Sequence, residues 1–187
     1  MYARGVNDSA LEELSKNVKL IKYDLLNQDI GKLDKDYSYI YHLAAVVGVN
    51  HVLKSPYNVL SKNVLLLQRA IDLGKNQKDL SRFIFTSTSE VYAYSLKSKL
   101  VKYPTPENID FLISKDFNPR TSYLLSKVVG EYLMNYSGLN FVIFRPHNIF
   151  GPQMGFRHVI PQLTKKILQY SKNKIIIQNA KHKRTFC

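Results

Sequence analysis

Cysteine and tryptophan are nearly absent from this chain of 187 residues. There is no tryptophan, and the single cysteine is Cys187, the last residue of the sequence. One cysteine cannot form a disulfide within the chain, and it cannot supply the paired thiolates of a common structural zinc site. The sequence also has no cluster of histidines and carboxylates that suggests a metal, so we expect none.

Long hydrophobic runs are absent as well. No apolar run approaches the roughly 20 residues that a membrane-spanning helix needs. Residues 1–5 form no apolar signal core. Together with the single cysteine, these absences predict a cytoplasmic protein with no membrane partner.

Acidic residues are few compared with basic ones. The sequence has 27 lysines and arginines against 14 aspartates and glutamates, a formal net charge of +13. Such an excess raises the question of nucleic acid. The lysines are scattered, however, and only residues 181–184 are densely basic, with no recognition motif beside them. We therefore expect no nucleic-acid partner and a surface that favours phosphorylated small molecules.

What the chain does contain is an alternation of β-rich runs and helical patterns. Hydrophobic residues make up 45% of the sequence, which suits a globular protein. The pattern predicts strands over 18–23, 38–43, 82–87, 141–145 and 174–177, and helices over 56–74, with Gly74 as its stop, over 118–137 and over 159–170. This alternation predicts an α/β fold with a doubly wound parallel sheet. Residues 94–117 form an irregular connection, long enough to predict a functional segment or a lid.

Polar residues follow the predicted strands at their carboxyl ends. They are Asp24, the segment 42–45, the segment 86–90, and His147 with Asn148. Ligands of parallel α/β sheets bind at this edge, whereas a structural protein has no need to gather polar groups there. We expect His42 and His147 to be hydrogen-bonded structural residues rather than bases.

The predicted helix over 118–137 carries the strongest chemical signal. Pro119 suits its first turn, and its repeated apolar residues are expected to face a core: Leu125, Val129, Leu133 and Tyr136. Tyr123 and Lys127 are four residues apart and share a face. An ammonium beside a phenol lowers the pKa of the phenol, so the pair can take a proton from a sugar or alcohol hydroxyl. Tyrosine and lysine also fall four apart on many helices by chance, so the pair alone does not decide.

Several blocks of the sequence occur together in a familiar order. They are Asp24–Leu25, His42–Ala45, Asn63, Thr86–Tyr92, Tyr123 with Lys127, and Arg145–Pro152, where Phe150 replaces a usual tyrosine. Together they resemble the extended short-chain dehydrogenase/reductase family, and within it the NAD-dependent epimerases and dehydratases of nucleotide sugars. His158–Pro161 and Arg184–Phe186 look like substrate-side segments of that family, so the resemblance spans nearly the whole chain.

The resemblance implies a Rossmann-like sheet, NAD as cofactor with NADP not excluded, and a nucleotide-diphosphate sugar as substrate. It implies cofactor-binding roles for Asp24, Leu25, Leu43, Ala44, Ala45, Asn63, Ser87, Tyr123, Lys127 and Pro146. It implies substrate-binding roles for Thr88, Asn148, Val159 and Arg184. A plain Asx turn remains the alternative for Asp24.

The resemblance also implies a mechanism. Tyr123, as phenolate, takes the proton of a sugar hydroxyl, while Lys127 lowers the pKa of Tyr123 and holds the nicotinamide ribose. Thr88 hydrogen-bonds the same hydroxyl. NAD accepts the hydride, and the transient keto-sugar is re-reduced on its other face, loses water or loses a neighbouring carboxylate.

Glu90 bears on which of these fates applies. A carboxylate at this place resembles 4,6-dehydratases and UDP-glucuronate decarboxylases, where it acts as a base or positions the substrate, so Glu90 joins Thr88, Tyr123 and Lys127 as a catalytic candidate. The alternative is that Glu90 caps a helical turn or faces solvent. We therefore predict an epimerase/dehydratase, with a UDP-glucuronate decarboxylase-like lyase as the alternative.

One departure from the family pattern is serious. No Gly-x-x-Gly-x-x-Gly turn occurs in the sequence. The chain is therefore interpreted as an internal fragment that lacks the first strand–helix–strand unit and most of the C-terminal substrate domain. Residues 1–150 are expected to form a partial NAD(P)-binding Rossmann domain with the catalytic residues, and 151–187 the start of a substrate-binding region. For the full-length form the resemblance implies a homodimer.

Two other classes of function stay open. One is an inactive truncated or non-catalytic relative that binds a dinucleotide, against which Thr88, Tyr123 and Lys127 argue. The other is a basic fragment associated with RNA or polysaccharide. Salt-dependent retention on heparin without any effect of NAD would favour the latter.

Overall fold

The computed structural model describes residues 18–19, 21–101, 104–115, 117–151, 154 and 158–169. The chain divides into two compact units, residues 1–145 and 146–187, which are described separately. This boundary falls five residues before the one expected from the sequence. The first unit holds the sheet and the residues of the candidate site.

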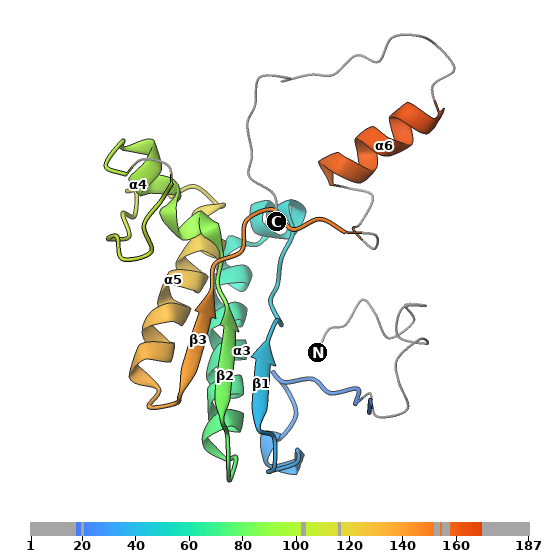
Figure 1. The fold of residues 1–187 in the computed structure, drawn as a ribbon, viewed down its shortest axis with the longest axis vertical. Coiled ribbons are helices and arrows are strands. Elements are labelled where there is room, and N and C mark those ends of the chain that lie inside the picture. Colours follow the sequence, from blue (N-terminus) through green and yellow to red (C-terminus); the bar gives the residue numbers. More distant parts are fainter. Residues whose placement is uncertain are drawn as a thin grey trace. The chain divides into compact units, whose positions relative to one another are not determined.

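A three-stranded parallel sheet forms the centre of the first unit (Figure 1). Its strands lie in the order β1 (Tyr39–His42), β2 (Arg82–Thr86) and β3 (Phe141–Phe144). The connecting elements are η1 (Ile30–Lys32), α2 (Val49–Lys54), α3 (Pro56–Lys75), η2 (Ser89–Tyr92), α4 (Ala93–Lys97) and α5 (Thr121–Tyr136). The predicted parallel, Rossmann-like α/β fold is confirmed.

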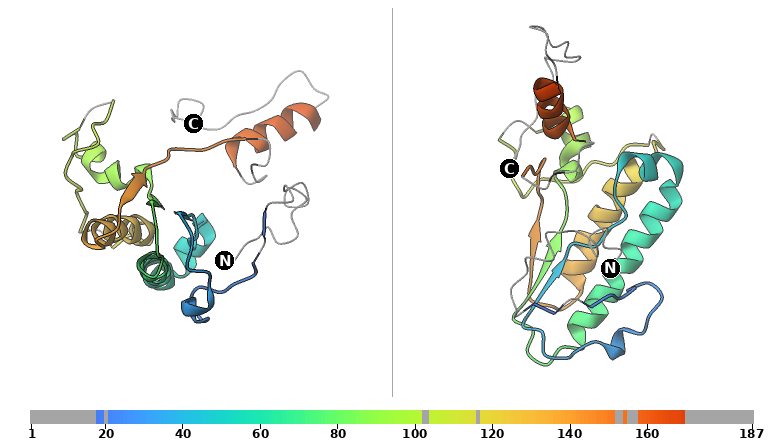
Figure 2. Two further views of the ribbon diagram at one scale, coloured as in Figure 1. Left: turned by 60° about the horizontal axis from the view of Figure 1, so that its bottom comes forward. Right: turned by 90° about the vertical axis from the view of Figure 1, so that its right-hand side faces the viewer.

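The two long helices, α3 and α5, pack side by side on one face of the sheet (Figure 2). Phe83 and Phe85 project from β2 into this layer, where both are fully buried. They meet Leu67 of α3 and Met134 of α5. Both crossovers therefore return on the same side, as right-handed connections in a parallel sheet do. The second helical layer of a doubly wound sheet is not among the described residues.

Glycine is required where the two helices approach each other and β2. A Cβ atom on Gly130 of α5 would lie 2.6 Å from Cζ of Phe85 and 3.0 Å from Cδ2 of Leu67. Gly74 is similarly tight, since its Cβ would lie 2.9 Å from Cδ1 of Leu139. The prediction that Gly74 stops its helix is wrong, because α3 continues through it to Lys75.

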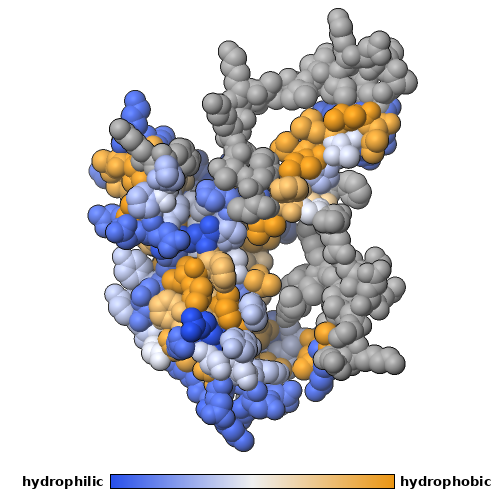
Figure 3. Space-filling view, viewed as in Figure 1, coloured by the Kyte–Doolittle hydropathy of each residue, from blue (hydrophilic) through white to orange (hydrophobic). Residues whose placement is uncertain are grey.

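The opposite face of the sheet carries several exposed side chains. Figure 3 shows hydrophobic side chains gathered over the strands β2 and β3. Phe144 at the end of β3 is 55% exposed, and Tyr41 of β1 is 65% exposed. Alternation along the strands explains this, because residues two apart share a face and Tyr41 pairs in register with Ile84, away from Phe83 and Phe85.

Two of the predicted strands need comment. The strand predicted over 18–23 is wrong, since the described residues of this segment form no strand and a turn begins at Asp24. Its β-rich composition is not accompanied by a sheet partner among the described residues. The strand predicted over 174–177 lies outside the described residues. The other three strands are confirmed within one or two residues.

The prediction of which residues of α5 face a core is wrong for two of its four members. Val129 is 38% exposed and Tyr136 is 79% exposed, whereas Leu125 and Leu133 are half-buried and Leu133 packs against the core. The buried row instead contains Leu124, Lys127, Val128, Glu131 and Met134. Hydrophobic periodicity missed it because two of its members are charged residues that find polar partners inside the fold. The helix also begins at Thr121, three residues after the expected start.

The long connection after β2 is more ordered than predicted. It begins with the helix α4, and residues 109 and 111 then pack with Tyr92 and Leu124 in a second apolar cluster. The Ser95 hydroxyl donates to the carbonyl of Asp110 and accepts from the amide of Leu112, over 3.0 and 3.2 Å. This segment therefore forms a wall beside the end of β2, and its role as a functional segment or lid stays a prediction.

The second unit contributes one described helix, α6 (Val159–Gln169), which confirms the helix predicted from Val159. None of its residues is buried. Among the described residues, no helix is long and apolar enough to span a membrane.

Candidate active site

Three residues of α5 form a row at intervals of four: Tyr123, Lys127 and Glu131. The row faces the carboxyl end of β2, because Lys127 Nζ donates to the Thr86 carbonyl oxygen over 2.6 Å. One turn later, Oε1 of Glu131 accepts from the Ser87 hydroxyl, also over 2.6 Å. The end of β2 is thus bonded to two successive turns of α5, through Lys127 and Glu131. Lys127 of the predicted Tyr–Lys pair is therefore held at the strand end.

Lys127 is buried, with 5% of its surface exposed. Its ammonium lies 5.0 Å from the centre of the Phe85 ring, a favourable cation–π distance. Burial lowers the pKa of Lys127 to about 8, since desolvation disfavours the charged form. An ammonium carries three hydrogens, so Lys127 has donor capacity beyond its bond to Thr86.

Tyr123 behaves differently from the expectation. Burial, and to a smaller extent the charge of Glu90, raise the pKa of the Tyr123 phenol to about 12. The expected lowering by Lys127 is wrong for this structure, because the Lys127 ammonium bonds the Thr86 carbonyl and lies 5.8 Å from the centre of the Tyr123 ring. Tyr123 is therefore a neutral phenol unless a further positive charge lies beside it.

Thr88 and Glu90 follow directly after β2. Thr88 is 8% exposed, and its hydroxyl oxygen accepts from the amide of Glu90 over 3.2 Å as the cap of η2. The cap of η2 is therefore Thr88, whereas the alternative that Glu90 faces solvent agrees with its exposed side chain. The Glu90 side chain is exposed, and its carboxylate is near enough to Tyr123 to raise the pKa of the phenol. Thr88, Glu90, Tyr123 and Lys127 thus gather at one end of β2.

Asn63 anchors the loop that follows β1. Its buried side-chain carbonyl accepts from the Val46 amide over 2.7 Å, and its amide donates to the Val46 carbonyl and to the Ser126 hydroxyl. This ties the segment Leu43–Ala45 to α3 and α5. Leu43 is 62% exposed and Ala44 and Ala45 are half-buried, so the segment is accessible to a ligand.

His42 is a structural residue, as expected. It is buried against Phe83 and Phe85, with ring centres 6.3 and 6.1 Å apart. Burial and the charge of Lys127 lower the pKa of His42 to about 4, so the imidazole is neutral at physiological pH. His42 therefore supports the site without carrying a charge.

Asp24 forms the Asx turn that was its alternative reading. Its carboxylate accepts from the Leu26 amide over 2.9 Å and from the Asn27 side chain over 2.7 Å. These bonds hold the pKa of Asp24 below its usual value, so it is ionised. The cofactor role of Asp24 and Leu25 stays a prediction.

Four predicted site residues do not belong to the first unit. Pro146, Asn148 and Val159 belong to the second unit, where Pro146 and Asn148 are half-buried and Val159 is exposed. Their ligand-binding roles stay predictions. Arg184 lies outside the described residues.

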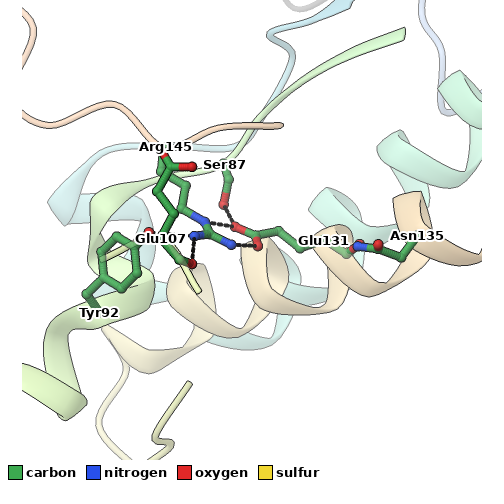
Figure 4. Close-up of polar contacts among 6 residues, drawn as sticks. All are labelled: Ser87, Tyr92, Glu107, Glu131, Asn135 and Arg145. Carbon is green, nitrogen blue, oxygen red and sulfur yellow. Dashed lines mark hydrogen bonds and ion pairs between the residues drawn. The ribbon is translucent and has the colours of Figure 1, made fainter. Parts of the chain in front are cut away.

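Sequence reasoning missed the most elaborate polar cluster of the structure (Figure 4). Arg145, at the end of β3, bonds both carboxylate oxygens of Glu131, over 2.9 and 2.6 Å. It also donates to the Glu107 carbonyl over 2.8 Å and to the Tyr92 hydroxyl. The signal that could have revealed it is Glu131, a charged residue that continues the Tyr123–Lys127 row by one turn.

Comparisons with known proteins show which family this chain belongs to. A model of the NAD-dependent epimerase/dehydratase family matches residues 2–187. The chain belongs to this family. The family assignment made from the sequence blocks is thereby confirmed.

Individual members of the NAD-dependent epimerase/dehydratase family show how far the similarity extends. A UDP-N-acetyl-alpha-D-glucosaminuronate decarboxylase of Bacillus cytotoxicus is 30% identical over 169 residues, which are 84% of this chain and 49% of that protein. Among solved structures, a UDP-N-acetylglucosamine 4-epimerase of Methanobrevibacter ruminantium, in complex with UDP-N-acetylmuramic acid, is 26% identical with a TM-score of 0.72. That match covers 92% of this chain and 54% of the other.

A UDP-glucuronic acid 4-epimerase of Bacillus cereus, solved in complex with UDP-glucuronic acid and NAD, is 28% identical with a TM-score of 0.66. It covers 88% of this chain, and this chain covers 50% of it. The chain thus spans about half the length of the relatives it matches. Epimerases and decarboxylases both occur among these relatives, so membership of the family does not by itself select a reaction.

Proposed function

We propose that these residues act, within a protein of the relatives' full length, as the catalytic half of an NAD-dependent nucleotide-sugar epimerase/dehydratase. One observation carries the proposal: the strand end after β2 brings Thr88, Tyr123 and Lys127 together on a buried scaffold. A hydroxyl, a phenol and an ammonium in this arrangement can handle the proton of a sugar hydroxyl.

The residues present fit the nicotinamide end of NAD. Lys127 offers ammonium hydrogens to a ribose hydroxyl, and the anchored segment Leu43–Ala45 provides an accessible surface next to it. The pyrophosphate is usually held by a glycine-rich turn at a helix N-terminus, and the sequence contains no Gly-x-x-Gly-x-x-Gly. When bound, NAD supplies the hydride acceptor of the reaction.

The residues of the chain then perform the proton chemistry. The pKa of Tyr123, about 12, is too high for the phenol to act as a base by itself near neutral pH. A positive charge brought close to the phenol stabilises the phenolate and lowers that pKa. We propose that Lys127 turns partly from Thr86 toward the substrate side when ligands bind, that Tyr123 takes the sugar proton, and that Thr88 holds the same hydroxyl. A transient keto-sugar results.

Decarboxylation is the second candidate. Two observations favour it: the 30% identical relative is a decarboxylase, and Glu90 is close enough to the site to affect the pKa of Tyr123. A carboxylate there can orient a substrate group next to the new ketone. In an epimerase, by contrast, the hydride only has to return to the other face of the sugar.

The direct test is turnover of UDP sugars, with NAD present, by a protein of the relatives' full length that contains these residues. UDP-glucuronate and UDP-N-acetylglucosamine are the first substrates to try, and the products are separated by chromatography. We expect a 4-epimer or a decarboxylated pentose derivative from one of them. Absence of any product, together with absence of NAD binding, would overturn the proposal in favour of a non-catalytic relative.

We also propose a homodimer in which α5 contributes to the interface. The outward face of α5 carries Val129, Tyr132 and Tyr136, which are 38, 54 and 79% exposed. Such an exposed apolar row on a helix suits a helix-packing interface. Light scattering on the wild type and on Tyr132→Glu tests this, and a monomeric wild type would contradict it.

A cytoplasmic location is likewise proposed, from the near absence of cysteine.

A further inference from the structure

The buried carboxylate of Glu131 has no part in the proposed proton chemistry. It bonds residues at the ends of two strands next to the site. On one side it accepts from Ser87, the residue directly before Thr88. On the other side its two oxygens accept from Nε and Nη2 of the Arg145 guanidinium (Figure 4). One carboxylate therefore connects α5, the end of β2 and the end of β3.

Arg145 extends this connection to the wall formed by the segment after α4. Its guanidinium donates to the carbonyl of Glu107 over 2.8 Å. It also lies over the rings of Tyr92 and Phe111, with its central carbon 5.2 and 5.1 Å from the ring centres. Arg145 therefore adds a further link to the wall, beside the bonds of Ser95 and the apolar packing of residues 109 and 111, and Arg145 is itself held by Glu131.

A buried ion pair of this kind is a poor device for stability alone. Glu131 is 3% exposed, and desolvation of two charges offsets much of their attraction. Well-packed apolar residues of similar size often stabilise as well or better. Apolar residues do not fix the relative orientation of two side chains. A bidentate arginine–carboxylate pair does, because it holds both partners in one plane.

We propose that Glu131 and Arg145 are positioning residues. They hold the end of β2 and the wall at residues 107–111 in fixed positions relative to Tyr123 and Lys127. Glu131 fixes Ser87, and through it the adjacent Thr88. Arg145 holds the wall in position through its bonds to Glu107 and Glu131. This inference rests on the proposed function for its catalytic consequence, but the clamping itself does not.

Two conservative variants test the clamp without any substrate. Glu131→Gln retains an acceptor for Ser87 but loses the charge, and Arg145→Lys retains the charge but loses the fork. Hydrogen–deuterium exchange is followed peptide by peptide. We expect exchange over residues 104–112 and 87–90 to accelerate about 10-fold or more, while α3 stays unchanged. The matched controls are Asp72→Asn and Arg82→Lys, which alter exposed residues of α3 and β2 and should change neither segment.

A third variant separates positioning from stability. In Glu131→Met with Arg145→Met the pair is replaced by apolar side chains, which should leave the melting temperature equal or higher. With UDP-glucuronate or UDP-N-acetylglucosamine, whichever the wild type turns over, we expect kcat to fall about 100-fold at a KM within about 3-fold of wild type. Wild-type kcat in this apolar variant would overturn the proposal, as would unchanged exchange over 104–112 in Arg145→Lys.

The two failures are distinguishable. If the wild type turns over neither sugar nucleotide, the proposed function fails, while the exchange measurement still decides whether the clamp exists. If the wild type is active and the exchange pattern does not change, the function stands and the clamp is wrong.

Discussion

Lys127 and Thr86 are joined across the first unit by a hydrogen bond of 2.6 Å from the ammonium to the carbonyl oxygen. This bond fixes the ammonium at the end of β2, and it explains why a lysine can be buried in α5. In Lys127→Met the carbonyl loses its donor, at a cost of about 1–3 kcal/mol, and removal of the desolvated ammonium offsets this cost, so the fold should tolerate the variant. We expect both NAD affinity and kcat to fall, kcat by about 100-fold.

Calorimetry and steady-state kinetics measure these two effects. Lys62→Met, which changes an exposed lysine of α3, is the matched control and should behave as wild type. Wild-type NAD affinity in Lys127→Met would show that the ammonium does not hold the cofactor.

Gly130 tests how tightly α5 must approach β2. In Gly130→Ala the new methyl would lie 2.6 Å from Cζ of Phe85, so either the ring or the helix has to move. We expect a loss of about 1–3 kcal/mol of stability from this overpacking, seen as a lower midpoint in urea. Gly151→Ala is the control, because no atom lies within 4 Å of its added Cβ. Equal midpoints for the two variants would contradict the packing described.

The strands and the helix around the site could be predicted from the sequence, but the buried polar contacts that hold them together could not. Strand runs such as 82–87 and the Tyr123–Lys127 spacing are local signals, and both were found in their expected places. The buried face of α5 was not predictable from hydrophobicity, because Lys127 and Glu131 lie on it. Their burial depends on partners 41 and 44 residues away in sequence, Thr86 and Ser87, which no local pattern reveals. The strand predicted over 18–23 failed for a related reason, since β-rich composition does not provide a neighbouring strand.

His42 gives the structure a pH dependence in the acid range. The pKa of His42 is lowered from 6.5 to about 4 by burial and by Lys127. Between these values the unfolded chain binds a proton that the folded chain does not, so stability is present above pH 6.5 and is lost as pH falls toward 4. The effect is on the order of 3 kcal/mol.

Urea unfolding at pH 7 and pH 4.5 measures this contribution. His42→Leu removes the titrating group, so its stability should fall less between the two pH values than that of the wild type. His147→Leu, at an exposed position, should show the wild-type fall. An identical fall in His42→Leu and the wild type would contradict the assignment.

Glu90→Gln separates the reaction classes while keeping the shape of the side chain. If the reaction is elimination or decarboxylation, the variant should still oxidise the sugar and then stall, so reduced cofactor accumulates after rapid mixing. If it is epimerisation, turnover should fall only about 2- to 5-fold, because a returning hydride needs no carboxylate. Glu107→Gln serves as the control carboxylate. An unchanged rate with no reduced cofactor would remove Glu90 from the catalytic residues.

The central claim is that Tyr123 takes the proton of the sugar hydroxyl, and Tyr123→Phe tests it most directly. This variant keeps the ring but loses the phenolic hydroxyl, and Tyr57→Phe, at an exposed tyrosine of α3, is the matched control. The measurement is single-turnover oxidation of the sugar nucleotide that the wild type accepts, followed by the absorbance of the reduced nicotinamide. We expect a loss of at least about 1,000-fold in Tyr123→Phe with NAD affinity within about 3-fold of wild type. A rate within 10-fold of wild type would contradict the account.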